Sequence, residues 1–170
     1  MRGTKLTAWQ VPKIWNDLQT GKLNAPENSK VLAHQKRLLE QTKATLNEIY
    51  KNVREGLLET VGIDCLLVID EKCSVKLNLP DQTETEKVAR AIDLENIEAW
   101  CDTEGKVHIA MNPWYSTKDV DQTVLSAVKV VHVLLGIHAG DTEKPKSFKQ
   151  KLMASIAEVM QIQQQNEDKK

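Results

Sequence analysis

Between positions 29 and 61, apolar side chains recur at steps of three and four residues, the period of an α-helix with one apolar face. Lysine, glutamate, glutamine and asparagine fill the positions between them, and Gly62 follows as a natural C-cap. At 1.5 Å per residue this helix would be roughly 50 Å long, more than a domain of this size ordinarily needs. Its stripe consists of Leu39, Thr42, Leu46, Ile49, Val53 and Leu57.

The period then changes to two, which predicts a β-hairpin over residues 63–79. A three-residue loop, Asp70-Glu71-Lys72 or the register one step along, keeps the apolar side chains of both strands on one face. A two-residue loop would put serine and lysine on that face. Pro80 ends the second strand. The apolar odd positions are Ile63, Cys65, Leu67, Ile69, Cys73, Val75, Leu77 and Leu79.

A second hairpin is predicted over residues 97–111. Residues 102–105, Asp-Thr-Glu-Gly, are typical of a type I turn that ends with glycine in the left-handed conformation. This register pairs Trp100 with His108 on the polar face and Cys101 with Val107 on the apolar face. Because Cys101 and His108 point in opposite directions, they cannot act together as nucleophile and base within this hairpin.

Two shorter helices precede and separate the hairpins. Pro12 lies at the start of the first and Gly21 lies just past its end. The second is a polar helix that ends near Ile92, and Thr83 with Glu86 three residues later has the form of a capping box at its start.

After the second hairpin, Ser116 and Asp119 indicate another capping box, and the following helix extends to about Ala139, with Gly140 as its C-cap. It is apolar over much of its circumference, so we expect it to be largely buried and to lie across the sheet. An amphipathic helix over about 148–162 follows.

These elements predict an α+β fold, with a four-stranded antiparallel sheet from two hairpins, a buried helix packed against it and a long N-terminal amphipathic helix. We expect an N-terminal segment with a short helix at 1–24, a single α+β domain at 25–163 and a disordered tail at 164–170.

Composition excludes some classes of function. A net charge of −1, from 23 basic and 24 acidic residues, provides no overall field that would attract nucleic acid or anionic lipid. The three cysteines are too few for a disulfide framework, and the first residues have no apolar run of the signal-peptide type. The longest apolar run, VVHVLLGIHA, is about half the length of a membrane span. We predict a cytoplasmic protein with reduced thiols that binds neither nucleic acid nor membrane.

The candidates for chemistry are few. Cys65, Cys73 and Cys101 all lie on the apolar faces of predicted strands, where they act as small core side chains. No CxxC or HxxxH spacing predicts a metal site, and His132 and His138 are six residues apart on different sides of their helix. No glycine-rich phosphate loop is present, so we predict no cofactor.

The cross-strand pair of Trp100 and His108 is the most informative feature of the polar face. Such pairs commonly stabilise a hairpin, but tryptophan is also a frequent anchor where a protein partner covers it. Trp114 and Tyr115 follow at the edge of the sheet, where they would extend a contact surface.

The long helix provides a second candidate surface. Its stripe through Leu39, Leu46 and Val53 would extend beyond what the rest of the domain covers, so we expect it to contact a second protein chain. The simplest such partner is another copy, in an antiparallel homodimer. The competing account is intramolecular coverage by the helices around Trp15 and Leu152.

We therefore favour a non-enzymatic protein-binding or assembly module, such as an adaptor, a dedicated chaperone or a regulatory subunit. The alternative is a small enzyme or ligand-binding domain, with a site assembled around His108 and Trp100 on the sheet face, together with Glu98.

Overall fold

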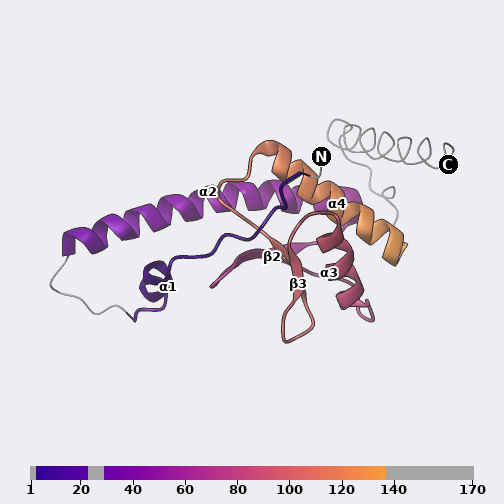
Figure 1. The fold of residues 1–170 in the computed structure, drawn as a ribbon, viewed down its shortest axis with the longest axis horizontal. Helices are drawn as coiled ribbons and strands as arrows, with labels where there is room; N and C mark the ends of the chain where they lie inside the picture. Colours follow the sequence, from indigo (N-terminus) through magenta and orange to yellow (C-terminus); the bar gives the residue numbers. More distant parts are fainter. Residues whose placement is uncertain (1–2, 23–28, 137–170) are drawn as a thin grey trace.

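The computed structural model describes residues 3–22 and 29–136 of the 170-residue chain, and the fold in this part is α+β (Figure 1). In chain order the elements are α1 (Lys13–Gln19), α2 (Ser29–Val61), β1 (Cys65–Ile69), β2 (Cys73–Leu77), α3 (Thr85–Leu94), β3 (Ala99–Cys101), β4 (Val107–Ala110) and α4 (Thr117–Leu135). The strands form one four-stranded antiparallel sheet, as the sequence predicts, and their order is β1-β2-β4-β3.

Both hairpins have the predicted registers. Ile69 is opposite Cys73, which leaves residues 70–72 as the loop of the first hairpin. Trp100 is opposite His108 in the second hairpin, and Gly105 has the expected positive φ of 73° in its turn. The hairpins join through their inner strands, β2 and β4, so residues 74–76 of one lie beside residues 108–110 of the other.

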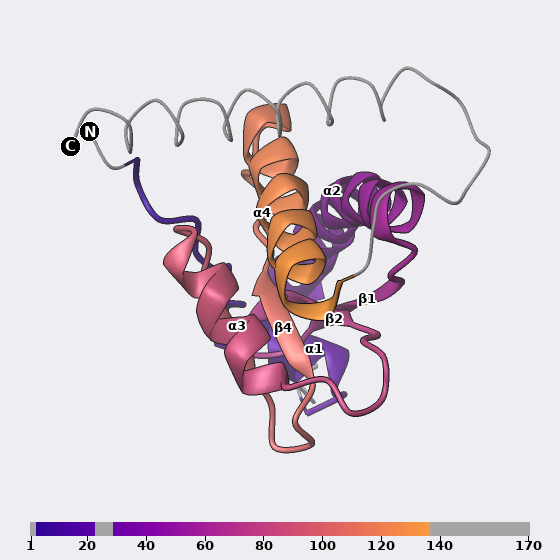
Figure 2. The same ribbon diagram turned by 90° about the vertical axis from the view of Figure 1, so that its right-hand side faces the viewer.

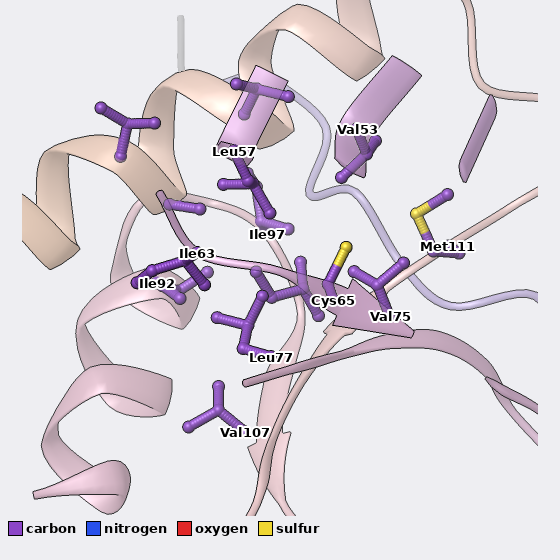
Figure 3. Packing of buried hydrophobic residues seen from close by; sticks show 14 of the residues in the cluster. Val53, Leu57, Ile63, Cys65, Val75, Leu77, Ile92, Ile97, Val107 and Met111 are labelled. Atoms are coloured by element: carbon purple, nitrogen blue, oxygen red, sulfur yellow. The ribbon is translucent and has the colours of Figure 1, made fainter. Parts of the chain in front are cut away.

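The helices α2, α3 and α4 cover one face of the sheet. Figure 2 shows α4 between α3 and α2, and the apolar core fills the space between this helical layer and the strands. Leu57 from α2, Ile92 from α3 and Leu77 from β2 meet there (Figure 3). The sequence predicts that α4 lies across the sheet. In the structure α4 packs mainly on α2 and α3, while α2 contacts β1 and α3 contacts β3 and β4.

The stripe on α2 is buried within the chain. Leu39, Leu46 and Val53 are only 3%, 0% and 0% exposed. The short helix α1 lies against α2, where Trp15 donates from Nε1 to the side-chain oxygen of Gln35 at 2.7 Å. The stripe is therefore not available to a second chain, and we withdraw Leu39, Leu46 and Val53 as partner contacts. Coverage within the chain is the account that fits: α2 packs mainly on α4 and also contacts β1 and α1, whereas Leu152 lies outside the described residues.

An N-terminal segment before α1 closes one end of the sheet. Leu6 pairs with Ile97 in a parallel bridge, and the Trp9 N–H donates to the Met111 carbonyl at 2.9 Å. The Cys73 N–H in turn donates to the Trp9 carbonyl at 2.9 Å. Trp9 and Val11 are buried in the same core as the helices and strands, so the segment is part of the packed fold.

The start of α3 and the end of α4 differ from the predicted boundaries. The helix α3 begins at Thr85, and the Thr83–Glu86 capping box does not form because the Thr83 hydroxyl donates to the Pro80 carbonyl instead. The capping box of Ser116 and Asp119 is confirmed.

The helix α4 ends at Leu135, four residues before the predicted end. Gly136 adopts the left-handed conformation, with φ of 62°, and its N–H donates to the His132 carbonyl, which closes the last turn. Gly140, His138 and the predicted helix at 148–162 lie outside the described residues. None of the helices described is long and apolar enough to cross a membrane.

Candidate functional site

A groove of about 850 Å³ lies between α1 and the face of the sheet that α2, α3 and α4 leave uncovered. We call it the sheet groove. The strands contribute Val68, Ser74, Lys76, Trp100 and His108, which belong to the alternate positions that point away from the core. Lys13 and Asp17 of α1, the loop residues 70–72 and the turn residues 102–104 complete its walls.

His108 is held in the floor of the sheet groove by two hydrogen bonds. Its Nδ1 lies 2.8 Å from the Ser74 hydroxyl, and its Nε2 lies 3.0 Å from a carboxylate oxygen of Asp102. The Asp102 carboxylate can only accept, so Nε2 carries the hydrogen, and in the neutral ring Nδ1 accepts from Ser74. Both ring nitrogens are thus satisfied, which fixes the orientation of the ring.

Asp102 is itself held by the hairpin turn. Its second carboxylate oxygen accepts the N–H groups of Glu104 and Lys106, at 2.9 Å and 2.8 Å. The Lys106 N–H, the His108 ring and the Glu104 N–H together hold the pKa of this carboxyl below its usual range. The turn therefore supplies an ionised acceptor for His108.

Trp100 stacks on the fixed histidine. The two rings are 5.5 Å apart between centroids and nearly parallel, at 11°. The Lys72 ammonium lies 5.0 Å from the centre of the Trp100 ring and also pairs with Glu98. The Trp100 ring is thereby braced on two sides and remains half-exposed in the sheet groove.

Glu98 links this cluster to the N-terminal segment. One carboxylate oxygen pairs with Lys72, and the other accepts the Ala8 N–H at 2.8 Å. Burial alone would raise the pKa of Glu98, but the Lys72 ammonium and the Ala8 N–H outweigh it, so the pKa is lowered. Glu98 is a structural anchor in this arrangement.

Ser74, His108 and Asp102 follow the order of nucleophile, base and acid, which the sequence pattern did not predict. In an acyl-transfer triad the serine contacts Nε2 and its oxygen is open to the substrate. Here Ser74 contacts Nδ1 and is only 1% exposed. A substrate carbonyl cannot reach the hydroxyl in this conformation, so the arrangement fits a rigid hydrogen-bonded floor better than a nucleophile.

The cysteines lie away from this face. Cys65 and Cys73 are buried in the core, as predicted, and burial raises the pKa of each thiol to about 12. Cys101 is half-buried, also with a raised pKa, on the opposite face of the sheet from Trp100 and His108. Thiols held in the protonated form are poor nucleophiles and metal ligands.

Trp114 and Tyr115, which the sequence predicts to extend the Trp100 surface, do not line the sheet groove. The Tyr115 hydroxyl donates toward the Thr7 carbonyl at 3.3 Å and the Ala110 carbonyl at 3.4 Å, and burial raises its pKa. Tyr115 thus fastens the N-terminal segment. Trp114 is 73% exposed and packs edge-on against Trp9, with ring centroids 6.0 Å apart, and it does not line the sheet groove.

The sequence did not identify Ser74 or Asp102 as members of the site. Ser74 faces His108 only because β2 and β4 are neighbours, which a hairpin pattern alone does not reveal. The signal that could have found the site is the alternation of side chains along each strand. It places Ser74, Lys76, Trp100 and His108 on the face of the predicted hairpins that points away from the core.

No group of three histidine, cysteine, aspartate or glutamate side chains within residues 3–22 and 29–136 is arranged to hold a metal ion. Comparisons of the chain with protein-family models, with curated proteins and with solved structures find no match.

Proposed function

We propose that this chain is a non-enzymatic protein-binding module and that the sheet groove holds an extended segment of another protein. The observation that carries the proposal is the braced Trp100 ring, half-exposed in an open groove and stacked on His108. A rigid aromatic side chain loses little conformational entropy when a partner covers it, which is why tryptophan is common at the centres of interfaces.

The lining of the groove supports a peptide over a small apolar ligand. Small-molecule sites are predominantly apolar, whereas Val68 and Trp100 are the only apolar side chains among the described residues that line the sheet groove, beside the polar ring of His108. Lysines and acidic residues of mixed sign form its walls, as at the polar rim of a protein interface. The mixture does not favour a polyanion.

Replacing Trp100 with alanine should weaken peptide binding at least about tenfold, because truncation of a central aromatic anchor typically costs more than 1 kcal/mol. Peptides are first selected by display on the wild-type protein, and their dissociation constants are then measured by fluorescence anisotropy. Trp114→Ala is the matched control, since it removes an exposed tryptophan outside the groove. Equal affinity for wild type and Trp100→Ala would contradict the proposal, provided that circular dichroism shows both variants folded.

The hydrogen-bonded order of Ser74, His108 and Asp102 favours a second candidate, a hydrolase acting through Ser74. We expect a fluorophosphonate probe to leave Ser74 unlabelled, because this residue is only 1% exposed and its hydroxyl is hydrogen-bonded to His108. Mass spectrometry of the treated protein makes the decision. A modified peptide containing Ser74, absent in Ser74→Ala, would replace the binding proposal with the enzymatic one.

A further inference from the structure

The outer edge of β1 pairs with no other strand among the described residues. In the order β1-β2-β4-β3, the other edge strand packs against α3, and its lead-in residue Ile97 pairs with Leu6. Figure 2 shows β1 at the side of the sheet away from α3. Within the described part of the chain, no strand pairs with β1 except β2.

The hydrogen bonds around β1 determine which backbone groups face outward. The Asn78 N–H donates to the Asp64 carbonyl at 2.9 Å, so that pair is hydrogen-bonded. In an antiparallel ladder hydrogen-bonded pairs alternate, so Leu66 and Val68 also direct their backbone groups toward β2. The bond from the Met111 N–H to the Cys73 carbonyl confirms the phase, because it places Cys73 toward β4.

Residues 65, 67 and 69 therefore direct their N–H and C=O groups away from the sheet. Those of Cys65 are satisfied: its carbonyl accepts from the Tyr50 hydroxyl at 2.9 Å, and its N–H donates to the Asp64 carboxylate at 2.8 Å. The four groups of Leu67 and Ile69 have no hydrogen-bond partner among the described residues.

The side chains of this edge do nothing to prevent pairing. Proteins usually protect an edge strand with lysine, proline, a bulge or a covering segment. The strand Cys-Leu-Leu-Val-Ile contains no charge and no proline, and Leu66 within it is 58% exposed. An uncharged strand with free donors and acceptors at alternate residues is a template for another strand.

We propose that the edge of β1 pairs with β1 of a second copy of this chain, antiparallel and centred on Val68. This register places Leu67 opposite Ile69 of the other copy, and Ile69 opposite Leu67 of the other copy. In each copy all four free backbone groups then form hydrogen bonds across the two-fold axis. A pairing centred on Leu67 would instead place Asp64 of one copy opposite Asp70 of the other, where the two carboxylates would repel each other. The Val68 centre opposes Asp70 to Leu66, so no like charges meet.

The pairing extends the four-stranded sheet to eight strands across two copies. Val68 also lines the sheet groove, so the two grooves approach each other at the two-fold axis. If the sheet groove binds a peptide as proposed above, the dimer presents two peptide-binding grooves side by side. Only this consequence rests on the proposed function. The pairing itself does not depend on whether the groove binds a peptide.

Sedimentation equilibrium of the full chain tests the pairing. We expect the wild-type mass to rise with concentration from 19.2 kDa toward that of a dimer. Val68→Lys should remain monomeric, because two lysines would face each other across the axis. Leu66→Lys is the matched control: it introduces the same lysine two residues away on the same face, but this lysine faces Asp70 of the other copy and the dimer should persist. Loss of the dimer in both variants, or in neither, would overturn the Val68 register.

Amide hydrogen exchange on the wild-type protein provides a test without substitutions. The N–H groups of Leu67 and Ile69 should exchange slowly in concentrated solution and quickly in dilute solution. Those of Leu66 and Val68, bonded to β2, should be protected in both. Fast exchange at Leu67 and Ile69 at every concentration, or a constant mass of 19.2 kDa, would overturn the proposal.

Discussion

Leu46→Glu is expected to unfold the chain. Leu46 is fully buried in the core cluster that also contains Val53 of the same helix. A carboxylate there loses its hydration without gaining a partner, at a cost comparable with the whole stability of a small domain, about 5–15 kcal/mol. Leu46→Ala should follow the same direction with a smaller effect, lowering the free energy of unfolding by about 2–5 kcal/mol.

Urea denaturation followed by far-ultraviolet circular dichroism measures both effects. Asn47→Glu is the matched control, since it introduces the same carboxylate at the next, exposed position and should change the free energy of unfolding by less than about 0.5 kcal/mol. A Leu46→Glu protein that keeps its helical spectrum would show that the stripe on α2 is not in the core.

The same experiment distinguishes an apolar stripe on α2 that is buried within the chain from one that contacts a second chain. A long amphipathic helix predicts an apolar stripe, but not which surface covers it. The bounds of α2 could be predicted because they depend on local period and on Gly62. The covering surface could not, because α2 packs mainly on α4, which follows both hairpins in the chain, and nothing local encodes that contact.

The strand registers were equally predictable, and for a local reason. A three-residue loop keeps the apolar side chains of each hairpin on one face, and the structure has the pairs Ile69–Cys73 and Trp100–His108. In the first hairpin the pattern leaves a second register open, one step along. The segment before α1 has no such pattern. It joins the sheet through contacts such as that from the Ala8 N–H to Glu98, 90 residues away.

The candidate site follows the same division. Trp100 and His108 were predicted as a pair because one hairpin contains both. Ser74 reaches His108 across the junction between the two hairpins, 34 residues away, and α1 forms the opposite wall of the groove. The members of the site that the sequence missed are those brought in by long-range packing.

His108→Phe should be less stable than Ser74→Ala/His108→Phe, although the latter carries one more substitution. Phenylalanine retains a ring to stack on Trp100 but removes both nitrogens, and the Ser74 hydroxyl is then buried without a partner. An unsatisfied buried polar group costs about 1–3 kcal/mol. Removing that hydroxyl in the same protein should recover part of the loss.

Urea denaturation of the wild type, both single variants and the double variant completes the cycle. Ser74→Ala alone should destabilise the protein by about 1 kcal/mol, because it leaves Nδ1 of His108 without its donor. The coupling between the two positions should therefore be of order 1 kcal/mol or more. Asp102 should remain satisfied in every variant, since it still accepts from the Glu104 and Lys106 N–H groups. Additive effects would mean that Ser74 does not hold His108 in solution, and the rigid floor beneath Trp100 would then lose its support.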